Sequence, residues 1–189
     1  MIPRYTRPEM GAIFSQAARF EFLMQVEIAV ARAQGELEII PQHDAQEIAS
    51  KAGFNIQRIE EIEKTTKHDV IAFVSSMAET IGESGRYVHY GMTSSDVLDT
   101  ALSVQVQAAG RILVKSLARL DKALKQLVID HRDTLCAGRT HGIHAEVTTF
   151  GLKMAGHLAE FRRNRERLNL ALENMRIAKL SGAVGTYST

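Results

Sequence analysis

The sequence predicts an all-α protein, in which a small N-terminal helical domain is followed by the first long antiparallel helices of a helical bundle. Apolar residues recur every three or four positions along most of the chain, which is the period of an amphipathic helix. All three prolines lie in the first quarter, so long helices can run without interruption after residue 41. No stretch indicates a confident β-strand. We expect the domain boundary between residues 92 and 93, which gives domains 1–92 and 93–189.

Composition and charge exclude several classes of partner. The chain carries 23 basic and 22 acidic side chains, and this balance gives no electrostatic reason to bind nucleic acid or a membrane surface. No apolar run approaches the ~18 residues of a membrane span, and the N-terminus lacks the apolar core of a signal peptide. The single cysteine, Cys136, cannot form an internal disulfide and fits a reducing cytoplasm.

The first eight residues are polar and contain two prolines, which predicts an extended arm. This arm is either a frayed terminus or a segment that offers Arg4 to a phosphate or carboxylate. Helical spacing runs from residue 15 to about residue 37, and we interpret Arg19 as a solvated surface charge. Shorter helices are expected at residues 44–51, from residue 55, and at about residues 70–81.

A triplet of polar residues, Lys67, His68 and Asp69, precedes the last of these helices. Asp69 is a candidate helix cap. His68 would then lie at the positive N-terminal end of the helix, where anions are favoured. A cap beside a surface histidine explains the triplet equally well, so both interpretations stay open here.

Three hydroxyl residues, Thr93, Ser94 and Ser95, and then Asp96 precede the first long helix. This order is typical of a helix N-terminus. One interpretation is that these residues only cap the helix. However, one cap needs one hydroxyl, and spare hydroxyls beside backbone N–H groups can hold a carboxylate or phosphate.

Two long helices are expected at about residues 96–131 and 148–180. The first keeps a heptad seam of leucines, at positions 113, 117, 120, 124 and 127. A helix of this length extends roughly 50 Å, which is more than a small domain needs. The pair predicts an antiparallel hairpin that cannot bury both faces by itself. We therefore expect a bundle that is completed by other copies of the chain.

The segment GRTHGIHAE, residues 138–146, joins the two long helices and is unusually polar. It is either a solvated turn or a functional loop held by rigid helices. His141 and His144 do not form a metal motif, because no third histidine or cysteine lies at zinc spacing. The chain has no glycine-rich phosphate loop either. Its histidines, hydroxyls and arginines suit anion binding and proton transfer without a cofactor.

The segment at 138–146 resembles the first signature of the fumarase/aspartase superfamily of helical β-elimination lyases. Four further stretches resemble the adenylosuccinate lyase family within it. They are RYTRPEM at 4–10, KHDV at 67–70, HYGMTSSD at 89–96 and SGAVGT at 181–186. The five stretches occur in order from residue 4 to residue 186, so the resemblance covers nearly the whole chain. Together they are far more specific than any one of them.

The resemblance implies a reaction and a set of site residues. The family releases fumarate from adenylosuccinate to give AMP, and from the related succinyl-carboxamide ribotide of purine synthesis, without a cofactor or metal. By this resemblance, His141 donates the proton to the leaving nitrogen, and His68 is a second active-site histidine. The residues implied to bind substrate are Arg4 and Tyr5 for the nucleotide, Lys67 and Asp69 with His68, Thr93 and Ser94 for the succinyl carboxylates, Thr140 beside the catalytic histidine, and His89 on the phosphate side.

The chain also departs from the family. Members are more than twice as long, and the later Ser-Ser-x-Met-Pro-x-Lys loop that supplies the base serine does not occur here. Family members are homotetramers whose active sites combine three subunits. We therefore expect that the sequence is cut within a longer protein and is inactive alone. The alternatives are a non-catalytic helical oligomerisation module, or another fumarate-releasing lyase of the superfamily.

Overall fold

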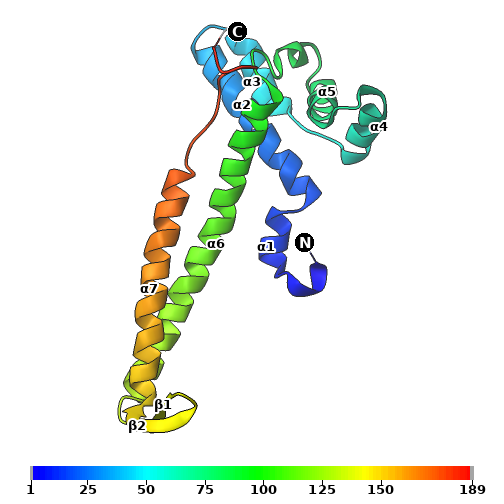
Figure 1. Cartoon of the computed structure of the whole chain (residues 1–189). Helices are drawn as coiled ribbons and strands as arrows, with labels where there is room; N and C mark the ends of the chain where they lie inside the picture. Colours follow the sequence, from blue (N-terminus) through cyan, green and yellow to red (C-terminus); the bar gives the residue numbers. More distant parts are fainter. Residues whose placement is uncertain (1, 188–189) are drawn as a thin grey trace. The chain divides into compact units, whose positions relative to one another are not determined.

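The computed structural model describes residues 2–187 and confirms the all-α class (Figure 1). The α-helices are α1 (Pro8–Ile13), α2 (Gln16–Glu36), α3 (Gln42–Lys51), α4 (Ile56–Thr66), α5 (Asp69–Ile81), α6 (Ser94–Asp130) and α7 (Phe150–Asn174). Two 3₁₀-helices, η1 (Pro3–Tyr5) and η2 (Glu83–Tyr87), and two strands, β1 (Leu135–Thr140) and β2 (Ile143–Thr149), complete the described elements. None of the described helices is long and apolar enough to cross a membrane.

The chain forms two compact units. One unit contains the residues up to Val106 and those from Arg176 onward, and the other contains Gln107–Met175. Helix α6 contributes its first turns to one unit and the remainder to the other. The expected domain boundary between residues 92 and 93 stays a prediction.

The core of the first unit is an apolar cluster built mainly by α2 and α5. Phe20 and Leu23 on α2, and Phe73 and Met77 on α5, are all at most 4% exposed. Each pair is three or four positions apart, so each helix presents one apolar stripe to the other elements. The Phe20 and Phe73 rings stack with centroids 5.6 Å apart. Phe54, in the segment before α4, packs against both rings.

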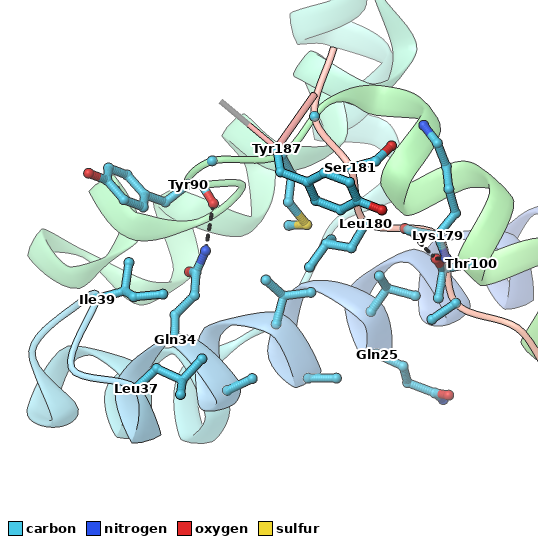
Figure 2. A pocket seen from close by; sticks show the side chains of 18 of the residues that line it. Gln25, Gln34, Leu37, Ile39, Tyr90, Thr100, Lys179, Leu180, Ser181 and Tyr187 are labelled. Atoms are coloured by element: carbon cyan, nitrogen blue, oxygen red, sulfur yellow. Dashed lines mark hydrogen bonds between the residues drawn. The ribbon is translucent and has the colours of Figure 1, made fainter. Parts of the chain in front are cut away.

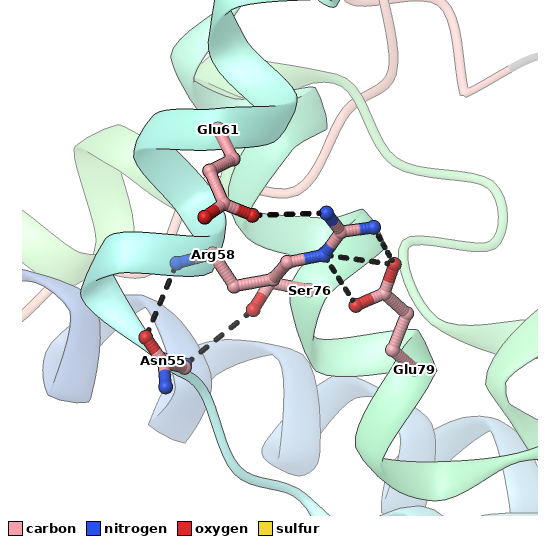
Figure 3. Close-up of polar contacts among 5 residues, drawn as sticks. All are labelled: Asn55, Arg58, Glu61, Ser76 and Glu79. Atoms are coloured by element: carbon pink, nitrogen blue, oxygen red, sulfur yellow. Dashed lines mark hydrogen bonds and ion pairs between the residues drawn. The ribbon is translucent and has the colours of Figure 1, made fainter.

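Helices α4 and α5 are also joined on their polar sides (Figure 3). Arg58 on α4 lies between two carboxylates, with Nη2 2.8 Å from Glu79 on α5 and Nη1 3.1 Å from Glu61. Asn55 caps α4 by accepting the N–H of Arg58 through its side chain, and its own N–H donates to the buried Ser76. These contacts fix the helix pair that carries the triplet, with Lys67 and His68 in the connecting turn and Asp69 as the first residue of α5.

Most expected helices are present, but two of the expectations are wrong at the ends of the chain. The N-terminal arm is not extended, since it contains η1 and the start of α1. Helix α7 ends at Asn174, not at about residue 180. The segment after it leaves the helix because its backbone binds α6 side chains: Lys179 N–H donates to Thr100, and Ser181 N–H donates to Asp96.

The second unit confirms the expected antiparallel helix hairpin. Two contacts show that α6 and α7 run in opposite directions, because the contact that lies later on α6 lies earlier on α7. A Cβ added at Gly110 would overlap Leu172, and Asp121 binds Arg162 through both carboxylate oxygens. Large apolar side chains remain exposed on this hairpin, among them Leu113 at 45%, Leu152 at 65% and Leu170 at 65%.

The expectation that the chain has no strand is wrong at one place. Strands β1 and β2 pair antiparallel at the end of the helix hairpin, with a bulge at Gly138/Arg139. The two residues between the strands, His141 and Gly142, have φ of 50° and 75°. Positive φ at both positions is typical of a type I′ turn, which matches the twist of a β-hairpin. Apolar and polar residues do alternate from Ile143 to Thr148, which is a strand pattern, although no residue of either strand is buried.

Candidate active site

His68 lies at the N-terminus of α5 and is its cap. Its Nδ1 accepts the backbone N–H of Ile71 at 3.3 Å. The expectation that Asp69 is the cap is therefore wrong, because Asp69 instead accepts the N–H of Val70. A neutral ring that accepts at Nδ1 carries its hydrogen on Nε2. His68 thus presents an N–H donor on the edge away from the helix backbone.

Asp69 is held by Arg19, which lies on α2. The Nη2 atom of Arg19 is 2.6 Å from the Oδ2 atom of Asp69. Arg19 is an exposed surface charge, as expected, with a side chain that is 46% exposed, but it also forms an ion pair that was not expected. Partial burial would raise the pKa of Asp69, but the Arg19 guanidinium and the Val70 N–H lower it below its ordinary value. Asp69 is therefore an anion held against α2, beside His68.

Asp96, on the first turn of α6, is fully buried and accepts four hydrogen bonds. Its Oδ2 accepts the N–H groups of Thr93 at 3.0 Å and Gly182 at 3.1 Å. Its Oδ1 accepts the N–H of Ser181 at 3.0 Å and the ammonium of Lys179 at 3.1 Å. Burial would raise the pKa of Asp96, but these donors lower it below its ordinary value. One carboxylate thus joins two of the five signature stretches.

The hydroxyl groups of Thr93 and Ser94 are not used to cap α6. Asp96 takes the N–H of Thr93, and neither hydroxyl makes a hydrogen bond to another residue within the described chain. Both residues are half-buried. Capping therefore does not explain these two hydroxyls, and they remain available to a ligand beside the positive end of a 37-residue helix.

His89 lies between η2 and α6 and is bound by a buried glutamate of α2. The Oε1 atom of Glu27 is 2.7 Å from the Nδ1 atom of His89, and Oε2 accepts the N–H of the same residue at 2.9 Å. The Glu27 side chain is 1% exposed and that of His89 is 20% exposed. This contact joins residues that are 62 positions apart.

Three other predicted site residues of the first unit lie apart from these contacts. Arg4 and Tyr5 belong to η1, where the guanidinium lies 4.8 Å from the Tyr5 ring centre. Lys67 has φ of 53° and ends α4 in a left-handed conformation. All three side chains are exposed. All three are therefore accessible to a ligand. Lys67 directly precedes His68, whereas Arg4 and Tyr5 make no hydrogen bond or ion pair with a histidine of the described chain.

The remaining two, Thr140 and His141, belong to the second unit. Thr140 is the last residue of β1, and His141 is the first residue of the type I′ turn. Both are exposed. The turn fixes the His141 backbone in the left-handed region, and the side chain has no hydrogen-bond partner among residues 2–187. No group of three or more metal-ligating side chains gathers anywhere in that range.

A cavity of about 590 Å³ lies in the first unit (Figure 2). It is walled by apolar residues of α2 and by the segment around Leu180. None of the ten predicted site residues lines it. The residues that bind Asp96, namely Lys179, Ser181 and Gly182, do line it. The predicted site residues of the first unit thus form clusters around Asp69, Asp96 and His89, and His141 belongs to the second unit.

Comparison with known proteins decides the family. The sequence model of a lyase family matches residues 4–189. The chain belongs to this lyase family. Adenylosuccinate lyase of Synechocystis sp. is 50% identical to it, that of Aquifex aeolicus 49% and that of Bacillus subtilis 48%. Each match covers the whole of this chain and 44% of the relative, so the chain spans less than half the length of these relatives.

Solved structures of lyase-like enzymes share the fold. A fumarate lyase from Mesorhizobium sp. BNC1 is 33% identical with a TM-score of 0.89, and the match covers 95% of this chain and 43% of that one. The 3-carboxy-cis,cis-muconate lactonizing enzyme from Pseudomonas putida is 30% identical with a TM-score of 0.90, over 97% of this chain and 44% of that one. These likenesses confirm the helical-bundle fold class of the lyase family.

Sequence reasoning missed two residues that organise the candidate site of this lyase family member. Arg19 was assigned to solvent, and Glu27 was not identified. A signal for Glu27 was present, because it lies four positions after Leu23, on the apolar stripe that also contains Val26 and Val30. A charged residue on a buried stripe needs a partner, and here the partner is His89. Arg19 gave no comparable signal.

Proposed function

We propose that this chain forms the N-terminal, substrate-binding part of an adenylosuccinate lyase, which releases fumarate from adenylosuccinate and from the succinyl-aminoimidazole-carboxamide ribotide of purine synthesis. The observation that carries the proposal is the identity of 48–50% to three adenylosuccinate lyases over the whole chain. Three solved structures of other enzymes with the same fold are 28–33% identical to the chain. The five signature stretches support the same choice of substrate.

In this proposal the exposed side chain of His141 donates a proton to the leaving nitrogen. The elimination places negative charge on a succinyl carboxylate, which needs fixed hydrogen-bond donors. Thr93 and Ser94 supply unused hydroxyls at the positive end of α6. Thr140 precedes His141 and contacts the substrate beside it.

His68 acts as a donor and not as the base. Its Nδ1 already accepts the N–H of Ile71, so protonation at Nδ1 would remove the cap of α5. Its Nε2–H can donate to a substrate anion while the cap remains intact. Lys67 and Asp69 flank it as substrate-binding residues. The nucleotide is bound by Arg4 and Tyr5, with His89 toward the phosphate.

We further propose that the active assembly is a cytoplasmic homotetramer that needs no cofactor, metal, nucleic acid or membrane. The exposed apolar side chains of the α6–α7 hairpin support association with further helices. The base belongs to a loop outside these 189 residues. Absence of a positioned general base typically lowers the rate by about 10²–10⁴-fold, and positioning by the other subunits is lost as well. The 189-residue chain alone is therefore inactive.

The test measures fumarate release from adenylosuccinate. We expect no turnover by the 189-residue chain and turnover by a polypeptide that extends it to the length of its relatives. In the extended protein, His141→Ala should abolish activity and leave the circular dichroism spectrum unchanged. The proposal is wrong if the extended protein does not release fumarate. Turnover by the short chain would place the base within these residues.

The other fumarate-releasing lyases of the superfamily are the second candidate, favoured by the 33% identity to the Mesorhizobium fumarate lyase. A panel of adenylosuccinate, argininosuccinate and aspartate separates the two, because a nucleotide-specific enzyme ignores the last two. A non-catalytic oligomerisation module is favoured by the exposed apolar side chains alone, and it predicts that no member of the panel is cleaved.

A further inference from the structure

Both carboxylate oxygens of Glu27 are used to hold one residue, His89. Oε2 accepts the backbone N–H and Oε1 lies 2.7 Å from the ring nitrogen Nδ1. Within the described chain Glu27 has no other hydrogen-bond or ionic partner. A buried carboxylate is costly unless it is paired. The core of the first unit therefore tolerates Glu27 because of His89.

The backbone of His89 also depends on this contact. Its φ of 64° lies in the left-handed region, which is uncommon for residues other than glycine. Such a conformation persists only where the surroundings fix it. The hydrogen bond from the His89 N–H to Glu27, in the middle of the core helix α2, does so. The contact is specific for a histidine at position 89, because the carboxylate binds the ring as well as the backbone N–H.

We propose that Glu27 is a positioning residue that fixes the backbone and the ring of His89, so that Nε2 is the edge of the ring offered to the phosphate group of a nucleotide. The inference rests on the proposed function, in which His89 lies on the phosphate side of the substrate. Glu27 itself is buried and does not touch the substrate. It acts through His89.

The chemistry of the ring makes the arrangement specific for an anion. A carboxylate is acceptor-only, so the ring hydrogen facing Glu27 is on Nδ1. A phosphate oxygen also needs a hydrogen, which must then be on Nε2. The ring that binds phosphate therefore carries both hydrogens and a positive charge, and the buried Glu27 carboxylate balances that charge. Hydrogen bonds between charged partners are about twice as strong as neutral ones.

A second contact between α2 and the same segment provides a matched control. Gln34 lies seven positions after Glu27 on α2 and donates to the carbonyl oxygen of Tyr90 at 2.8 Å (Figure 2). Gln34→Ala removes this anchor but leaves the Glu27–His89 contact. If Glu27 only anchors the segment, Glu27→Gln and Gln34→Ala should weaken substrate binding to the same extent.

The first experiment identifies the ring hydrogens by NMR of the 189-residue chain labelled with ¹⁵N-histidine. We expect a hydrogen on Nδ1 of His89 in the wild type and in Gln34→Ala. In Glu27→Gln the amide oxygen can still accept the His89 N–H, while the amide N–H donates to Nδ1 and displaces the hydrogen. A wild-type ring without a hydrogen on Nδ1 overturns the inference, and this result does not require that any variant folds.

The second experiment measures function. In the extended protein, Glu27→Gln should raise the KM for adenylosuccinate about tenfold or more and leave kcat within about threefold, as expected for a lost charge-assisted contact to the bound substrate. Gln34→Ala should leave both constants within about twofold. Equal effects of the two substitutions, or an unchanged KM in Glu27→Gln, overturn the inference.

The two proposals fail in different ways. If the extended protein releases no fumarate, the proposed function is wrong, and inorganic phosphate then tests the anion site directly. Phosphate should shift the His89 ring signals of the wild-type chain, and about tenfold more phosphate should be needed in Glu27→Gln. If phosphate leaves the His89 signals unchanged in that case, the inference is wrong too.

Discussion

Replacing Asp96 by asparagine tests how the first unit joins two signature stretches. The substitution keeps the size and shape of the side chain but converts one acceptor oxygen into an N–H₂ donor. If the amide oxygen takes the place of Oδ2, it keeps the N–H groups of Thr93 and Gly182. The new N–H₂ group then faces two other donors, the N–H of Ser181 and the ammonium of Lys179.

The loss is therefore two hydrogen bonds to a charged acceptor, each worth about 1.5–3 kcal/mol. The Lys179 contact contributes less than the other, because that side chain is 37% exposed and its ammonium can turn to water. We expect about 2–4 kcal/mol of local destabilisation in the segment that follows Arg176. At ~1.4 kcal/mol per factor of ten, this raises the open fraction of the segment about 30- to 700-fold.

Hydrogen–deuterium exchange of residues 178–183 measures this opening directly. The matched control is Thr100→Val, which removes two neutral hydrogen bonds to Lys179 from the same segment and should have a smaller effect. Unchanged exchange in Asp96→Asn, or exchange no faster than in Thr100→Val, would refute the reasoning that the buried charge holds this segment.

Three further predictions concern stability. The pKa of Asp96 is lowered in the folded chain, so its stabilising contribution is complete above the ordinary value of ~3.9 and is lost as pH falls through the folded value. Urea midpoints between about pH 5 and pH 2 should therefore fall more in the wild type than in Asp96→Asn; parallel curves would contradict this. Gly151→Ala should cost about 1–3 kcal/mol in urea unfolding, because its Cβ would lie 2.7 Å from a backbone atom of the segment after α6. The control Gly156→Ala, on the same helix with nothing within 4 Å, should instead stabilise by up to about 1 kcal/mol, and equal effects would contradict the packing argument. Arg19→Met should cost at most about 1 kcal/mol because the ion pair is exposed, but NMR titration should show a higher pKa for Asp69, and an unchanged pKa would show that Arg19 is not its cause.

Helix positions were predictable wherever a helix buries one face. The apolar residues of α2 and α5 recur at three and four positions, and the structure buries those stripes. The β-hairpin had two local signals that were overlooked, although no residue of β1 or β2 is buried. Apolar and polar residues alternate from Ile143 to Thr148. The His141–Gly142 dipeptide precedes them, and glycine at the second position favours a two-residue turn.

The end of α7 was missed for a different reason. Apolar spacing continues through Met175 to Leu180, so local sequence favours a longer helix. The structure instead directs the backbone of residues 179–182 to Asp96 and Thr100 of α6. Contacts between residues that are 79–86 positions apart cannot be recognised from the spacing of apolar residues in the local sequence. Tertiary hydrogen bonds to a buried carboxylate therefore outweigh helix propensity here.

The stretch at residues 89–96 combines polar atoms that hold the structure of the site with polar atoms that are left for a ligand. The carboxylate of Asp96 is fully used by the fold, as is the Nδ1 side of the His89 ring. The hydroxyls of Thr93 and Ser94 have no partner within residues 2–187, and the structure offers no packing reason for a hydroxyl at either position. Sequence identity alone does not separate these two groups, because a residue that holds the site and a residue that binds the substrate can both be required. The hydrogen bonds do separate them: polar atoms already bound within the chain hold the site, and those left unbound beside the α6 N-terminus are available to a ligand.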